Sequence, residues 1–460
     1  MPRSRTYLNE SFIYARFLRR IDVKHLLIVA FGALAGCASG GHAQERVQAY
    51  VGARIIPIEG GEIPAGVLLV QRGKILAVGP SDTVDIPADA NRVDLTGKVI
   101  LPGLICTHSH IGGIGGADGS GPIQPDVRVY DSIDVLDPGF RRAVAGGLTS
   151  LNIMPGSGHL MSGQTVYVKL RHRPKTIEDI AYRDDEGKIL GGMKMANGTN
   201  SMKAPPFPGT RGKSAALVRQ KFIKAQEYRE KLQRGLEDPN KLPARDIGME
   251  AMVEVLEGTR MVHHHTHRHD DIMTVLRLAR EFGFRVVLHH VSEGWKVAEQ
   301  IAAAEVPCSI ILLDSPGGKL EAIDLIFTTG GVLERAGVPV AFHTDDGITD
   351  SRLFLRMAAL GVRAGMSRGA ALEAVTLAGA RMLDLQDRIG SLRPGKDADF
   401  VVLSGDPFSV YTQVLETWVE GVKVFDRSDP KDRLYAVGGY GAGHGQTPYH
   451  CCFADEEDQP

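Results

Sequence analysis

The stretch that decides the fold is V-I-L-P-G-L-I-C-T-H-S-H, at residues 99–110. Its apolar first half predicts a buried strand, and two histidines stand at the end of that strand. Because side chains along a strand point alternately to opposite faces, the spacing of two places His108 and His110 on the same face. Two neutral imidazoles on one face can bind a single Zn²⁺, so this stretch predicts a strand that ends in a metal site.

Further along the chain, helical and strand patterns alternate. Residues 272–282 carry apolar side chains at helical spacing up to Gly283, and residues 284–288 follow as a buried strand. The pattern repeats as a helix over 296–305, a strand over 308–313 and a strand over 338–342. Strand and helix in turn imply parallel strands with crossover helices, and this many units predicts an α/β protein with a closed (β/α)₈ TIM barrel.

Short β segments lie on both sides of this region. Residues 46–100 carry brief apolar runs separated by glycine and proline turns, and a similar stretch returns over 385–428. We therefore expect a small composite β-sandwich domain, built from these two segments, beside a barrel domain over 101–384. The tail, residues 429–460, is rich in glycine and charge, and we expect it to be poorly ordered.

Residues 1–45 are predicted to be an export signal and tether. Basic residues precede an apolar run, Leu26–Ala35, that is too short to span a bilayer as a stable helix. The run ends in L-A-G-C, which resembles a bacterial lipobox and makes Cys37 the predicted lipidation site. Ordinary signal cleavage after residues 41–43 is the alternative. The favoured hypothesis is a periplasmic protein that a lipid anchors to a bacterial membrane.

Composition and charge limit the partners. The chain has 460 residues, of which 43% are hydrophobic and 23% charged, as in an ordinary globular protein with a large core. Fifty-three Lys+Arg against fifty-five Asp+Glu give a net charge of -2, which offers no electrostatic surface for nucleic acid. We expect a small-molecule substrate, no nucleic-acid partner and membrane contact only through the lipid, and we leave a homo-oligomer open.

The histidines are concentrated where barrel chemistry occurs. Of sixteen histidines, ten fall at four predicted strand ends, namely His108/His110, His263–His269, His289/His290 and His343. In barrels of this type the active residues gather at the C-terminal ends of the strands. Strand alternation predicts that one of His289 and His290 faces the barrel mouth while the other packs outward. A metal-binding low-complexity tract is the alternative for 263–269.

Asp345 ends the predicted strand that begins at residue 338. A carboxylate at this position is costly unless it is paired with cations or a metal ion. Asp345 is therefore the natural general base.

These motifs resemble a known family. Residues 102–110 resemble the first-strand signature of the amidohydrolase superfamily, and G-S-L-R-P-G-K-D-A-D at 390–399 resembles its C-terminal signature. The resemblance covers about residues 46–425 and is greatest to the imidazolonepropionase-like branch. It implies a metal-dependent hydrolase that acts on C–N bonds. The metal ligands that it implies are His108, His110, Lys194, His265, His290 and Asp345.

The bridging lysine and the residue that supports His108 are the two positions where the resemblance leaves a choice or a departure. Many members of the superfamily bridge two metal ions with a fourth-strand lysine that CO₂ has carboxylated, and M-K-M-A-N-G at 193–198 resembles that segment. Lys169 is the rival for this role, and a site with one ion and no modified lysine is the third option. Cys106 stands where the superfamily usually has aspartate, which puts the support of His108 and the metal affinity in question.

The resemblance implies hydrolysis of an amide bond in a dipeptide, an acylated amino acid or a cyclic amide. One or two Zn²⁺, or other divalent ions, would activate the water, and Asp345 would take its proton and deliver it to the leaving nitrogen. His267 and Arg268 are the candidate substrate-binding residues.

Two alternatives stay open. Deamination of a nucleobase-like ring is disfavoured, because related deaminases often carry glutamate where this chain has Arg268. An exported metal-binding or ligand-binding lipoprotein with a decayed site is the alternative from another class, and Cys106 is the reason to keep it.

Overall fold

The computed structural model describes residues 46–312, 320–438 and 442. The predicted export signal, the predicted lipidation site Cys37 and most of the predicted tail lie outside the described residues. None of the helices in the described ranges combines the length and the apolar character that a membrane crossing requires.

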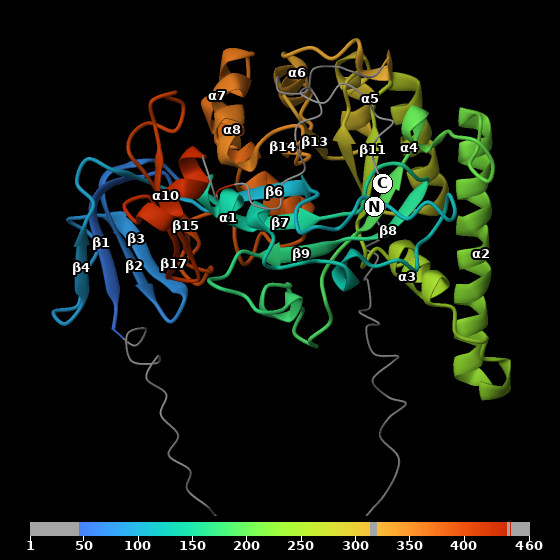
Figure 1. Ribbon diagram of the computed structural model, residues 1–460, viewed down its shortest axis with the longest axis horizontal. Helices are drawn as coiled ribbons and strands as arrows, with labels where there is room; N and C mark the ends of the chain where they lie inside the picture. Colours follow the sequence, from blue (N-terminus) through green and yellow to red (C-terminus); the bar gives the residue numbers. More distant parts are fainter. Residues whose placement is uncertain (1–45, 313–319, 439–441, 443–460) are drawn as a thin grey trace, which may run out of the picture. The chain divides into compact units, whose positions relative to one another are not determined.

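An α/β barrel forms the centre of the protein (Figure 1). Its strands form two sheets, of order β14-β13-β12-β11-β10-β8 and β6-β7-β9. Their bounds are β6 (Leu104–Ser109), β7 (Leu148–Ile153), β8 (Met161–Gln164), β9 (Val166–Lys169), β10 (Met193–Ala196), β11 (Val262–Thr266), β12 (Val286–His290), β13 (Cys308–Ile310) and β14 (Val340–Phe342). The backbone N–H of Asp345 donates to the carbonyl of His108 at 3.1 Å, which brings the end of the last strand to the end of the first.

One part of the barrel differs from the parallel arrangement that the alternation predicts. Strands β10 to β14 pair in parallel, and so do β6 and β7. In contrast, β8 and β9 run antiparallel to β10 and β7, with only Thr165 between them. Residues 154–160 lead from β7 to β8 without a crossover helix, and a chain that turns back in this way can pair only in the antiparallel sense.

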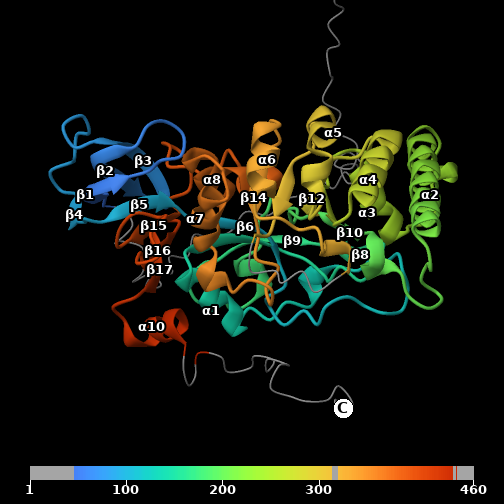
Figure 2. The same cartoon turned by 90° about the horizontal axis from the view of Figure 1, so that it is seen from above.

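Helices surround the strands. They are α1 (Pro138–Ala145), α2 (Arg211–Glu237), α3 (Ile247–Leu256), α4 (His269–Phe282), α5 (Ala298–Ala303), α6 (Thr329–Arg335), α7 (Arg356–Arg363), α8 (Arg368–Ala374) and α9 (Leu377–Met382). Helix α4 confirms the predicted periodicity, since it buries Ile272, Val275 and Phe282. It ends at Gly283, whose φ of 75° forms a left-handed C-cap. Helix α2 packs against α3 and α4 on the outside of the barrel (Figures 1 and 2).

Segments from both ends of the described chain build one further sheet. Its strands are β1 (Gln48–Ile55), β2 (Ile63–Gln71), β3 (Lys74–Pro80), β4 (Asn91–Asp94), β5 (Val99–Pro102), β15 (Phe400–Leu403), β16 (Val414–Val419) and β17 (Val422–Asp426). The order is β17-β16-β15-β5-β1-β2-β3, with β4 beside β1. Antiparallel pairing of β15 with β5 joins the two segments, and Figure 2 shows the blue and red strands side by side. Both predicted β segments contribute strands, and they do so to one continuous sheet.

Part of the segment that we expected to be poorly ordered is helical. Helix α10 (Pro430–Val437) begins at Asp429, whose side chain accepts a hydrogen bond from the backbone N–H of Lys431 at 2.8 Å. Asp432 also forms an ion pair with Arg141 of α1. A cap and a tertiary ion pair outweigh the weak helical propensity of this segment.

Candidate metal centre

The C-terminal ends of β6 and β14 place three predicted ligands together. Nε2 of His108 lies 3.0 Å from Nε2 of His110 and 3.3 Å from Oδ1 of Asp345. The same carboxylate oxygen lies 2.9 Å from Nε2 of His110. Asp345 reaches this position with a φ of 49°, just after β14. Donor atoms from the first and last strands of the barrel therefore converge on one small region.

His289 and His290 both face this cluster, so the prediction that one of them packs outward is wrong. Nδ1 of His289 lies 3.3 Å from Nδ1 of His108, and Nδ1 of His290 lies 3.2 Å from Nε2 of His343. The reason is the backbone at His290, where a φ of 71° ends the strand alternation. His290 belongs with His108 and Asp345 to a group whose donor atoms lie within 4.8 Å of one another.

Lys194 lies in the cluster, whereas its rival Lys169 does not. Nζ of Lys194, on β10, is 3.2 Å from Nε2 of His108 and 3.1 Å from Sδ of Met154. Nζ of Lys169 instead lies 3.0 Å from a carboxylate oxygen of Asp399, in a separate buried ion cluster. Geometry therefore selects Lys194 as the lysine that can take part in a metal centre.

His265 and His267 lie beside the first group, next to a glutamate that the sequence analysis missed. Together with Glu321 they form a second buried group of donor atoms within 4.8 Å of one another. Nδ1 of His267 is 2.7 Å from Oγ of Ser292, which orients its ring. Arg268 instead forms a two-pronged ion pair with Asp270 at the start of α4, at distances of 3.0 and 2.9 Å.

A chain of buried side chains extends from His108 into the barrel. Nε2 of His289 lies 3.0 Å from Nδ1 of His263, and Nε2 of His263 lies 3.0 Å from the hydroxyl of Tyr167. A Cβ at Gly192 would come within 2.3 Å of the His263 ring, so the glycine leaves room for that ring. His263 has no predicted role, although the alternation of side chains along a strand places it on the same face as His265 and is the signal that could have found it.

The hydrogen bonds of Cys106 go to the backbone of His108 and to Thr344, and none of those seen in the described residues goes to the ring of His108. Its Sγ lies 3.1 Å from the backbone carbonyl of His108 and accepts a hydrogen bond from the N–H of Thr344 at 3.3 Å. The carboxylate of Asp346 is buried nearby. It accepts hydrogen bonds from Ser109 at 2.5 Å and from Thr344 at 2.8 Å. Cys106 therefore supports the backbone between β6 and β14, and His289 contacts the metal-ligand ring in its place.

Burial controls the protonation of the cluster. It lowers the pKa of His108 well below the ordinary value, and the Lys194 ammonium lowers this pKa further. Burial likewise lowers the pKa of His289 and of His290. Burial alone would raise the pKa of Asp345, but the His108 and His110 rings outweigh it and hold this pKa well below the ordinary value. Near pH 7 the site offers neutral imidazoles beside an ionised carboxylate.

These donors fit a divalent metal ion. Nε2 of His290 is buried and has no hydrogen-bond partner among the described residues, which is costly for a polar atom unless a ligand occupies it. Neutral imidazole and carboxylate are the donors that zinc takes in catalytic sites. His108, His110, His290 and Asp345 would hold such an ion, with Lys194 beside them.

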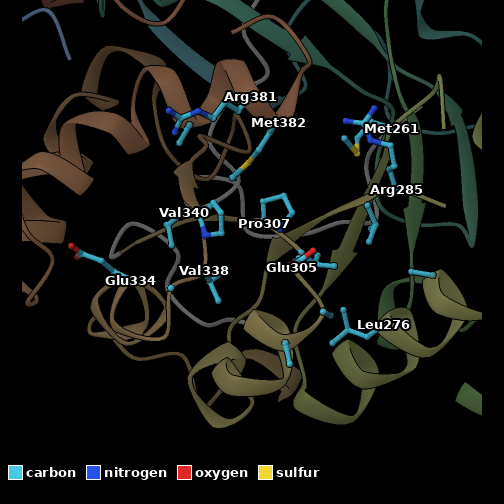
Figure 3. Close-up of a pocket in the computed structure, with 18 of the residues that line it drawn as sticks. Met261, Leu276, Arg285, Glu305, Pro307, Glu334, Val338, Val340, Arg381 and Met382 are labelled. Atoms are coloured by element: carbon cyan, nitrogen blue, oxygen red, sulfur yellow. The ribbon is translucent and has the colours of Figure 1, made fainter. Parts of the chain in front are cut away.

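A separate cavity of about 970 Å³ lies at the other end of the barrel (Figure 3). Met261, Val286, Pro307 and Val340 line it, and these residues stand at the N-terminal ends of β11 to β14. The histidines stand at the opposite ends of the same strands. None of the predicted site residues lines this cavity. Active sites of such barrels lie at the C-terminal ends of the strands, which is the end where the histidines are.

Comparison with known proteins identifies relatives of this chain. Residues 182–425 match the amidohydrolase family. The chain is 28% identical over 392 residues to the amidohydrolase tasK of Hapsidospora irregularis; the match covers 78% of this chain but only 40% of that longer protein. It is 25% identical over 389 residues to the imidazolonepropionase of Paracoccus denitrificans, covering 74% and 88% of the two chains. The crystal structure of an amidohydrolase from Thermotoga maritima is similar at 33% identity and a TM-score of 0.76, over 82% of this chain and 100% of that one.

Proposed function

Because the chain belongs to the amidohydrolase family, whose members are metal-dependent hydrolases of C–N bonds, we propose that it cleaves an amide bond in a small molecule. The substrate classes that we favour are dipeptides, acylated amino acids and cyclic amides. The observation that carries the proposal is the convergence of Asp345 with His108 and His110, at 3.3 and 2.9 Å.

In this proposal Zn²⁺ is the first choice of metal ion. When bound, it would polarise the substrate carbonyl and make water a nucleophile near neutral pH. Asp345 is the general base and then the general acid: its carboxylate accepts the water proton and returns it to the leaving nitrogen. The lowered pKa of Asp345 keeps the carboxylate ionised before the reaction begins. Lys194, carboxylated or not, adds a buried cationic or bridging group beside His108.

Substitution of Asp345 tests the reaction. Asp345→Asn keeps the size of the side chain and one coordinating oxygen but removes the base, so we expect retained metal and a fall in kcat of about 10²–10⁴-fold. The measurements are metal content by mass spectrometry and kcat on a panel of dipeptides, N-acyl amino acids and cyclic amides. Unchanged kcat would remove Asp345 from the mechanism.

The same panel distinguishes the alternatives. The chain is also 24% identical over 380 residues to a 5-methylthioadenosine/S-adenosylhomocysteine deaminase from Symbiobacterium thermophilum, so nucleosides belong in the panel. Ammonia release without a new carboxylate would favour deamination. Metal binding without turnover of any compound in the panel would favour the alternative of a metal-binding or ligand-binding protein with a decayed site. Export and lipidation at Cys37 remain a proposal that rests on the N-terminal sequence alone.

A further inference from the structure

We propose that His159 and Lys203, at the mouth of the barrel, bind a carboxylate of the substrate. This assignment rests on the proposed function, because it selects among the substrates of the same centre. It favours dipeptides and acylated amino acids, which carry a free carboxylate, over uncharged cyclic amides. Arg268, the cation that the sequence suggested for substrate binding, is not free for this role, since Asp270 accepts two hydrogen bonds from its guanidinium at 3.0 and 2.9 Å.

Both residues stand in segments that follow the C-terminal ends of barrel strands. His159 lies in the connection between β7 and β8, and Lys203 lies after β10. The connection begins at Met154, whose carbonyl lies 2.8 Å from Nδ1 of His110 and whose Sδ lies 3.1 Å from Nζ of Lys194. The segment that carries His159 therefore begins at the candidate metal centre, on the side of the barrel from which a substrate reaches it.

The side chain of His159 is buried without the partners that a buried imidazole needs. Only 2% of the residue is exposed, and neither ring nitrogen forms a hydrogen bond of normal geometry with a described residue, although the carbonyl of Asp118 faces the ring. Burial and the nearby Lys203 ammonium lower the pKa of the ring, which is therefore neutral near pH 7 and carries one N–H. A buried N–H without an acceptor is costly, and a carboxylate oxygen of a ligand satisfies it.

An ammonium group stands beside this ring. Nζ of Lys203 lies 4.9 Å from the centre of the Phe207 ring, which meets the ring of His159 edge to face with centroids 5.0 Å apart. Among residues 46–312 and 320–438, no carboxylate forms an ion pair with Lys203. Asp118 also faces His159, but its carboxylate is exposed to water and accepts the backbone N–H of Ser120 at 2.9 Å. A cation beside a buried N–H suits a carboxylate, which accepts a charge-assisted hydrogen bond from each.

Paired substrates test this assignment. N-acetyl amino acids and dipeptides are assayed beside their C-terminal carboxamides, which keep the scissile bond and lack the charge, with enzyme loaded with Zn²⁺. We expect wild type to prefer the acids by about 10–100-fold in kcat/KM, mainly through a lower KM, because a hydrogen bond to a charged group contributes roughly this factor. Lys203→Met should abolish most of this preference, and Lys203→Arg, which keeps the charge, should retain it.

Three further variants separate binding from folding. His159→Leu should lower the preference for acids, whereas His159→Gln, which keeps a side-chain N–H, should retain more of it at a similar melting temperature. Lys213→Met is the matched control, because Lys213 is an exposed lysine on α2. It should keep the wild-type preference.

Equal kcat/KM values for acids and carboxamides in wild type would overturn the carboxylate site, and so would a preference that survives Lys203→Met. If wild type hydrolyses neither class, the proposed function fails, and calorimetry with the same compounds on zinc-loaded Asp345→Asn tests the carboxylate site by itself. Acids that bind about 10-fold or more tightly than carboxamides, with the difference removed when Lys203→Met is added, would support the site. Equal or undetectable binding would overturn it.

Discussion

At the scale of single residues, His289 decides how His108 presents its metal-binding nitrogen. A histidine that binds metal through Nε2 carries its proton on Nδ1, which must donate to an acceptor. With a metal ion on Nε2 of His108, Nδ1 of His289, at 3.3 Å, would be that acceptor. His289→Leu removes it, and we expect zinc affinity to fall about 10–100-fold in competition with a chromophoric chelator.

His289→Asn is the matched variant, because its side-chain oxygen can take the place of Nδ1. We expect it to keep most of the affinity. Tyr167→Phe, at the far end of the histidine chain, should have a smaller effect than His289→Leu. Equal losses in the leucine and asparagine variants would show that His289 only fills space.

The site residues could be predicted from the sequence where a single physical rule determined their position. His108, His110 and Asp345 follow from strand ends and from the cost of an unpaired carboxylate, and the structure brings them together. The inward position of both His289 and His290 was not predicted, because the φ of 71° at His290 ends the alternation of side chains. A single backbone angle of this kind cannot be read from the hydrophobic pattern. The position of Glu321 was not predicted, because only the fold brings this residue close to His265 and His267.

At the scale of elements, β8 pairs in the antiparallel sense with β10, the strand that supplies Lys194. Gly163 of β8 pairs with Lys194 of β10, adopts a φ of 125° and lies so close to its neighbour that a Cβ would come within 2.5 Å of the carbonyl of Val127. Gly163→Ala should therefore lower the free energy of unfolding by about 1–3 kcal/mol. Denaturant titration measures this loss.

The control is Gly209→Ala, where a Cβ meets nothing within 4 Å and the φ is ordinary. Its unfolding midpoint should stay at the wild-type value or rise slightly. If Gly163→Ala were equally neutral, the packing of β8 against residue 127 would be unimportant for stability.

Elements with strong periodicity could be predicted, and the weakly patterned ones could not. Helix α4 has apolar residues at every helical turn and a glycine cap, so its bounds follow from the sequence. Strands β8 and β9 are four residues each, and their direction depends on the length of the connection after β7. Direction is a property of the path of the chain, which no local pattern contains.

At the scale of the whole molecule, a buried ion cluster joins the barrel to the composite sheet. Lys169 of β9 forms ion pairs with Asp397, with Asp399 at 3.0 Å and with Glu420 at 3.4 Å. Asp397 and Asp399 lead into β15, and Glu420 connects β16 to β17. The composite architecture was predicted from two similar β segments, but this connection was not, because Lys169 was considered only as a metal-bridging residue.

Removal of one charge from this cluster should destabilise the protein in a pH-dependent way. Burial raises the pKa of Asp397, but Lys169 and Lys74 outweigh it, so its pKa in the folded protein lies below the ordinary 3.8. A carboxyl whose pKa is lowered by folding stabilises the protein above its unfolded pKa and loses this effect as the pH falls. Asp397→Asn should therefore cost about 3–5 kcal/mol of unfolding free energy at pH 7, because it leaves part of the Lys169 charge unpaired.

The cost should shrink as the pH falls through 3.8, because the unfolded wild-type chain then binds a proton at this carboxyl, which the folded protein takes up only at a lower pH. Urea denaturation of both proteins between pH 3 and pH 7 measures the difference. Asp384→Asn, at an exposed carboxylate that pairs with Arg285, is the control and should cost at most about 1 kcal/mol. A difference between wild type and Asp397→Asn that is the same at every pH would mean that the side chain contributes shape alone, and that charge does not hold the sheet to the barrel.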